Sequence, residues 1–129
     1  MTAAAIARYL IALVGGSFIL FGIAYLAQPE AVLALTGSFQ LDSNALTDSR
    51  ATYGGIQLGL GMYLLLLLRR NDGIASALLL LGVALTTVGA SRIAGYLIDG
   101  DVSIMHLVVG LQEMGIAAFA IALMRRLPE

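Results

Sequence analysis

The residues best suited to chemistry in this sequence are polar and ionisable side chains set inside long apolar stretches. They form three groups along the chain: Arg50, Tyr53 and Gln57; Arg92 and Tyr96; and His106, Gln112 and Glu113. An ionisable group at the centre of a membrane span costs at least ~2.5–3.5 kcal/mol, so such groups usually face the interior of a bundle and mark function. We therefore predict that these residues bind a ligand, with Glu113 and His106 as candidate catalytic acid and base.

The spacing of these residues places each group on one face of a helix. Arg50, Tyr53 and Gln57 recur at intervals of three and four, and His106 and Glu113 are seven apart. At ~1.5 Å per residue, Glu113 lies roughly 16 Å below the outer end of its stretch, near the membrane midplane. Gln57, Arg92 and His106 lie about 6–10 Å below the outer surface by the same rise. We expect a polar pocket in the outer half of the membrane, with an apolar floor.

Structural roles for the same side chains remain open. Arg50 could extend to the outer surface with its stem along apolar chains, and the two tyrosines could belong to an interfacial aromatic belt. His106 could form a hydrogen bond near the interface. A midplane carboxyl must be neutral, paired or hydrated, and Arg92 is the nearest cation by depth, so a structural Glu113–Arg92 pair is an alternative.

The elements that carry these groups are predicted to be membrane-spanning helices. The chain has 129 residues, of which 60% are hydrophobic and 12% charged, whereas soluble domains are about 45–50% apolar and about 25% charged. Four apolar stretches have the ~20 residues that a span requires: about 6–27, 50–68, 74–98 and 102–124. We expect the first to be retained, because its apolar run is too long for a signal peptide. The prediction is a single domain over residues 1–129, all-α, a bundle of four antiparallel transmembrane helices.

The charges predict an orientation. All seven basic residues are arginines, and five of them flank the inner ends of the predicted spans, at Arg8, Arg69, Arg70, Arg125 and Arg126. The positive-inside rule then places both termini in the cytoplasm. The long first connection contains "PEAVLALTG", from Pro29 to Gly37, which predicts a short helix at the outer interface.

Glycines are predicted to form the packing surfaces between helices, because close backbone approach matters where water drives no association. Three glycine pairs are seven residues apart: Gly15 and Gly22, Gly54 and Gly61, and Gly82 and Gly89. Gly55 and Gly59 form a small-xxx-small motif. From these the predicted packing positions are Gly54, Gly55, Gly59, Gly61 and Gly89.

Composition also excludes several kinds of site. The chain has no cysteine and one histidine, so neither a thiolate site nor a multi-histidine metal site is expected. A net charge of −1 gives no basis for nucleic-acid binding. We predict no metal and no cofactor, because no phosphate-binding or dinucleotide fingerprint is found.

The blocks "RATYGGIQLGLGMYLLL", "RIAGYLIDGD" and "HLVVGLQEMG" together resemble a family of small four-span bacterial membrane proteins labelled as a domain of unknown function. The Arg-x-x-Tyr-Gly-Gly motif from Arg50 to Gly55 is the most specific part, and the arrangement is loosely similar to DoxX-like proteins. The resemblance implies a glutamate, in many members, where this chain has Gln57. It implies an architecture and no reaction.

Four functions follow as hypotheses, and the one ranked last is a transporter or proton path, because the inner halves of the predicted spans lack polar residues to complete a route. The first is a binding module for an amphiphilic or lipid-like small molecule, with the headgroup in the polar pocket. The second is a membrane enzyme, of isomerase or hydrolase type, that uses Glu113 and His106. The third is an accessory or assembly subunit of a larger membrane complex. A homo-oligomer and a larger membrane protein are the protein partners left open.

Overall fold

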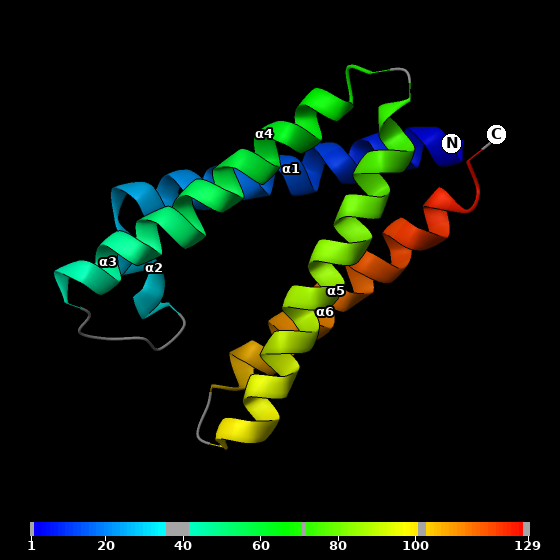
Figure 1. The fold of residues 1–129 in the computed structure, drawn as a ribbon. Helices are drawn as coiled ribbons and strands as arrows, with labels where there is room; N and C mark the ends of the chain where they lie inside the picture. Colours follow the sequence, from blue (N-terminus) through cyan, green and yellow to red (C-terminus); the bar gives the residue numbers. More distant parts are fainter. Residues whose placement is uncertain (1, 36–41, 71, 101–102, 128–129) are drawn as a thin grey trace. The chain divides into compact units, whose positions relative to one another are not determined.

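Figure 1 shows a computed structural model of the chain, which describes residues 2–35, 42–70, 72–100 and 103–127. Within these residues every regular element is a helix, so the all-α prediction is confirmed. The elements in chain order are α1 (Ala3–Ala27), α2 (Pro29–Ala34), α3 (Ser43–Ser49), the π-helix η1 (Arg50–Gly55), α4 (Ile56–Leu67), α5 (Gly73–Asp99) and α6 (Ile104–Met124).

Three of these helices, α1, α5 and α6, are long and apolar enough to cross a membrane. Their bounds lie close to the predicted stretches 6–27, 74–98 and 102–124, with residue 102 outside the described part. A run of about 20 apolar residues spans the hydrocarbon region as a helix, because only internal hydrogen bonds satisfy its backbone there. The three helices indicate an integral membrane protein.

The predicted second span, 50–68, is the last part of a longer helical run. α3, η1 and α4 follow one another without a break from Ser43 to Leu67. The run begins seven residues before the predicted start, because the Asp42 carboxylate accepts a hydrogen bond of 2.8 Å from the Ala45 amide and caps α3. α4 alone has 12 residues, fewer than a span requires, so a fourth crossing would include the π-helical turns.

The short helix α2 occupies Pro29–Ala34, inside the segment where the sequence predicts a helix. Pro29 stands at its first position, where the missing amide hydrogen is not needed. Pro29 and Leu33 are buried. The predicted stop at Gly37 lies outside the described residues, and the position of α2 at a membrane interface stays a prediction.

The chain divides into two compact units, one of residues 11–66 and one of residues 1–10 with 67–129. In the first unit, α1 and α4 pack antiparallel through glycines (Figure 1). A Cβ added to Gly22 would lie 2.7 Å from the Leu58 amide nitrogen. One added to Gly61 would lie 2.6 Å from the Gly15 carbonyl oxygen. These distances are shorter than side chains allow, so the two backbones approach only because glycine occupies these positions.

In the second unit, α5 and α6 form an antiparallel hairpin. A Cβ added to Gly82 would lie 2.7 Å from Ile121 Cγ1, and one added to Gly89 would lie 2.7 Å from the Gly110 carbonyl oxygen. The hairpin's buried side chains are small and branched apolar residues from both helices: Ala77, Leu78, Leu81, Leu85, Ala117, Ala120 and Leu123. The tight glycine contact lies toward the end of the hairpin that carries the polar residues.

The predicted packing glycines differ in their surroundings. Gly54 faces Leu26 of α1, and a Cβ there would lie 2.9 Å from the leucine Cγ. A Cβ added to Gly55 or Gly59, the small-xxx-small pair, would meet no described atom of another helix within 4 Å. The seven-residue pairs therefore carry the contacts within each unit.

Candidate functional site

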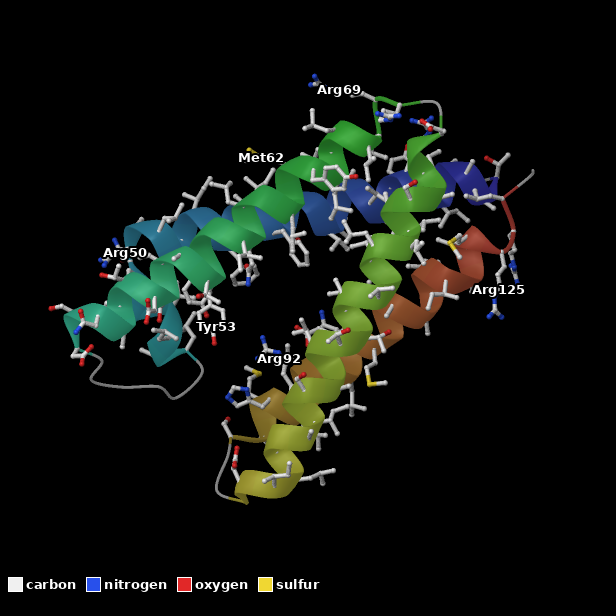
Figure 2. The ribbon with its side chains drawn as sticks, viewed as in Figure 1. Arg50, Tyr53, Met62, Arg69, Arg92 and Arg125 are labelled. Atoms are coloured by element: carbon white, nitrogen blue, oxygen red, sulfur yellow. The ribbon has the colours of Figure 1, made fainter. Side chains whose placement is uncertain are left out.

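Three of the predicted site residues contact one another on the α5–α6 hairpin. Arg92 Nε donates to both carboxylate oxygens of Glu113, at 3.1 Å to Oε2 and 3.3 Å to Oε1. Arg92 Nη1 lies 3.4 Å from His106 Nδ1. Figure 2 labels Arg92 on α5, among polar side chains of this part of the hairpin. The guanidinium thus bridges a carboxylate and an imidazole on the neighbouring helix.

The glycine contact of the hairpin positions this cluster. Gly89 and Gly110 face each other across the two helices, and Arg92 and Glu113 each follow one of them by three residues. Residues three apart lie on the same helical face. A Cβ on Gly110 would lie 3.2 Å from Arg92 Cβ, and one on Gly89 would lie 3.3 Å from Glu113 Cβ. The close backbone approach therefore brings the two charged side chains within hydrogen-bonding distance.

The ion pair between Arg92 and Glu113 is largely shielded by the hairpin. The exposed fraction of the side chain is 32% for Arg92 and 16% for Glu113. Charge-assisted hydrogen bonds are stronger than neutral ones, and one negative charge balances one positive charge. The cluster can therefore stand in an apolar surrounding, where a lone charge would be costly. The structure thus contains the Glu113–Arg92 pair that the sequence offered as a structural alternative. A role of the two residues in ligand binding stays a prediction.

The contact between Arg92 and His106 is a hydrogen bond in one of the two histidine tautomers. A guanidinium has only donors, so Nδ1 of His106 must accept. The ring proton then resides on Nε2, on the side of the ring away from Nδ1. Within the described residues Nε2 has no hydrogen-bond partner. A neutral histidine in this tautomer offers one N–H to a further group.

The other predicted residues of this hairpin lie beside the cluster. Tyr96 follows Arg92 by one helical turn and is half-buried. Gln112 precedes Glu113 by one residue and is exposed, because a step of one residue turns the helix by about 100°. Tyr96 therefore shares the cluster's face of α5, whereas Gln112 lies on another face of α6.

The predicted residues in the other unit contact the last turns of α1. Arg50 Nε donates to the Leu26 carbonyl oxygen at 3.3 Å. That carbonyl belongs to the final turn of α1, where backbone acceptors lack intrahelical partners. The ring of Tyr53 lies against that of Tyr25, with centroids 5.3 Å apart. Gln57 is half-buried. Arg50 thus has a structural role, and a pocket that these residues share with Arg92 stays a prediction.

The π-helix is a feature of this region that hydrophobic periodicity does not predict. It spans Arg50–Gly55, and the Ile56 amide that follows it donates to the Ala51 carbonyl, five residues back. Such segments are rare and occur frequently at functional sites. The adjacent Gly54 and Gly55 are the one local signal, since glycines are common at helix irregularities. The segment coincides with the Arg-x-x-Tyr-Gly-Gly motif.

A comparison with protein families gives one match over nearly the whole chain. The family described as a domain of unknown function (DUF4345) matches residues 6–124. The chain belongs to this family. The predicted membership of an uncharacterised family is thereby confirmed. No curated protein matches the chain, and no solved structure does. The DUF4345 match includes both the π-helix and the Arg92 cluster.

The described part of this DUF4345 chain contains no group of three or more His, Asp or Glu side chains placed to hold a metal ion. Its polar cluster offers hydrogen-bond donors from Arg92 and His106, while Glu113 is engaged by the guanidinium. Such an arrangement can orient a polar group on a molecule that otherwise lies among apolar side chains.

Proposed function

We propose that this protein binds an amphiphilic or lipid-like small molecule at the Arg92 cluster, in the outer half of a four-span bundle. In this proposal the Ser43–Leu67 helical run supplies the fourth crossing, and α2 lies at the outer interface. The protein resides in a bacterial inner membrane with both termini in the cytoplasm. The arginine-rich turn after α4 and the arginines after α6 support this orientation.

The observation that carries the proposal is the bridging position of Arg92 between Glu113 and His106. A polar cluster within apolar helices is costly, and intramembrane ionisable residues mark functional sites by default. Glu113 is nine residues from the start of α6, or roughly 14 Å along the helix. Arg92 is seven residues from the end of α5, or about 10 Å. The cluster therefore lies at a depth where a ligand's headgroup could reach it while its tail contacts apolar residues.

The chemistry of the cluster specifies the headgroup. Arg92 has five N–H donors, of which Nε serves Glu113 and one on Nη1 is directed at His106. The remaining guanidinium donors and the His106 Nε2–H are available to acceptor oxygens. Glu113 already balances the charge of Arg92, so a neutral acceptor such as a carbonyl or ester oxygen fits without adding net charge. The ligand we expect is therefore an apolar molecule with an acceptor oxygen.

Native mass spectrometry of the protein extracted from its own membrane tests this proposal. We expect a discrete bound molecule on the wild type and on Ser91→Ala, and its loss from Arg92→Ala and Glu113→Gln. Ser91 is a matched control, because it precedes Arg92, is exposed and donates only to the Thr87 carbonyl. A wild-type protein that carries only bulk lipid would overturn the proposal and favour the accessory-subunit role.

Acid–base catalysis by Glu113 and His106 is the second candidate. Both residues contact the same guanidinium, so a substrate at Arg92 would lie within reach of both. The ion pair favours binding over catalysis, because Arg92 Nε donates to both oxygens of the Glu113 carboxylate, and a substrate would have to displace this contact before Glu113 could take a proton. The enzyme role would replace simple binding if two outcomes were found together. The wild type would have to release the bound molecule in a chemically altered form, and Glu113→Gln would have to release the same molecule unaltered.

A further inference from the structure

Five arginines lie at one end of the unit formed by residues 1–10 and 67–129. Arg8 is on the second turn of α1, Arg69 and Arg70 follow α4, and Arg125 and Arg126 follow α6. The antiparallel hairpin brings the start of α5 and the end of α6 to the same end, since Gly82 contacts Ile121. Figure 2 labels Arg69 and Arg125 there. We call these five residues the arginine end.

A hydrogen bond joins two of the three segments that form the arginine end. Arg8 Nη1 donates to the Leu68 carbonyl oxygen at 3.1 Å, which fixes the start of α1 beside the turn after α4. That turn is tight, because a Cβ on Gly73 would collide with the Leu67 carbonyl oxygen. Arg69 and Arg70 are therefore presented on a short, constrained connection.

The arginine end carries an excess of positive charge. All five side chains are exposed, and Asp72 is the one acid among the described residues of these three segments. Asp72 accepts from Arg70 Nε at 3.3 Å, and this hydrogen bond lowers the pKa of the Asp72 carboxyl. Five positive charges against one negative charge leave an excess of four. Arg69, Arg125 and Arg126 have no side-chain partner in the described structure.

We infer that the arginine end binds the phosphate groups of anionic phospholipids in the adjacent membrane leaflet. The apolar runs of α4 and α6 stop directly before Arg69 and Arg125, so these side chains lie where the hydrocarbon region gives way to headgroups. A guanidinium matches the geometry of a phosphate with paired donors. Clusters of four to eight basic residues next to a span are typical of binding to anionic lipids. This surface is separate from the Arg92 cluster and does not depend on the proposed ligand.

Native mass spectrometry with a defined lipid mixture tests the inference. The purified protein is exchanged into mixed micelles that contain equal amounts of phosphatidylglycerol and phosphatidylcholine with identical acyl chains. We expect the wild type to retain phosphatidylglycerol in preference. Arg125→Gln with Arg126→Gln should reduce that preference by roughly fivefold or more, from the attraction of each basic residue for an anionic surface.

Two controls make the result specific to this surface. Arg125→Lys with Arg126→Lys keeps the charge and should retain most of the preference. Ser91→Ala changes an exposed residue of α5 outside this surface and should leave the preference unchanged. The measured quantity is the ratio of bound phosphatidylglycerol to bound phosphatidylcholine within one preparation. A lower yield of any variant therefore does not change the comparison. No preference in the wild type, or equal preference in the glutamine double variant, would overturn the inference.

Discussion

Substitution of Gly89 by alanine tests the packing that positions the Arg92 cluster. The added Cβ would lie 2.7 Å from the Gly110 carbonyl oxygen, whereas an ordinary contact begins at 3.4 Å. The helices must therefore separate locally by about 0.7 Å, which is the difference between these two distances. If Arg92 Nε moved with α5, its 3.1 Å distance to Glu113 Oε2 would grow to about 3.8 Å and the hydrogen bond would be lost.

Gly89→Ala has two opposing effects on stability: the cost of overpacking and the higher helix propensity of alanine. Overpacking a tight contact costs typically 1–3 kcal/mol, and the backbone oxygen of Gly110 cannot rotate away. Alanine gains up to about 1 kcal/mol over glycine in helix propensity. We expect a net loss of about 0–2 kcal/mol in the free energy of unfolding relative to the wild type. Thermal unfolding in a mild detergent, followed by circular dichroism, would measure it.

Gly115→Ala is the matched control, since a Cβ on Gly115 meets no atom within 4 Å. This variant keeps the gain in helix propensity without the collision, so its stability should equal or exceed that of the wild type. Equal stability of Gly89→Ala and Gly115→Ala would refute the argument. It would show that the two backbones do not approach each other at Gly89 and Gly110 as closely as the structure has them.

Three further predictions concern charged side chains. Arg50→Gln removes the hydrogen bond that Arg50 Nε donates to the Leu26 carbonyl at the end of α1. It should lower the free energy of unfolding by about 0.5–1.5 kcal/mol, measured by denaturation in detergent. Glu113→Gln leaves Arg92 without its charged partner and should lower the free energy of unfolding by about 1–3 kcal/mol, less than the loss of a fully buried pair, because both side chains are partly exposed. The double variant Arg92→Leu with Glu113→Leu removes both charges. It should restore most of that stability while ligand binding stays lost. Arg70→Gln should return the lowered pKa of Asp72 toward its ordinary range, observed by carboxyl carbon NMR. Because the folded-state pKa is the lower one, the pair's stabilisation is present above the unfolded-state pKa and is lost as the pH falls through the folded-state pKa; an Asp72 titration that does not respond to Arg70→Gln would contradict this.

The part of the candidate site on the α5–α6 hairpin could be partly predicted from the sequence. The depth of Arg92 and Glu113, counted along two apolar helices, indicated that the two charges could meet. The contact of His106 with Arg92 required the actual register of the hairpin. Gln112 was predicted with its neighbour Glu113, but one residue of helical rotation places it on an exposed face.

The sequence by itself determined the long helices of this protein. A run of about 20 apolar residues has few stable alternatives to a helix, because the backbone must satisfy its own hydrogen bonds in a membrane. The ends of α1, α5 and α6 accordingly lie close to the ends of the apolar runs. The start of α3 did not follow from hydropathy, because its residues are polar and the Asp42 cap decides where it begins.

Only the tertiary structure decided which glycines form contacts and which arginines have structural partners. Gly89 and Gly59 look equivalent as small residues in apolar helices, yet one meets a neighbouring backbone and the other meets nothing within 4 Å. The role of Arg50 in ligand binding stays a prediction, and the structure adds a contact of its guanidinium with the last turn of α1. Close approach and capping depend on the register between two helices, and the periodicity of one helix carries no information about the register of its partner.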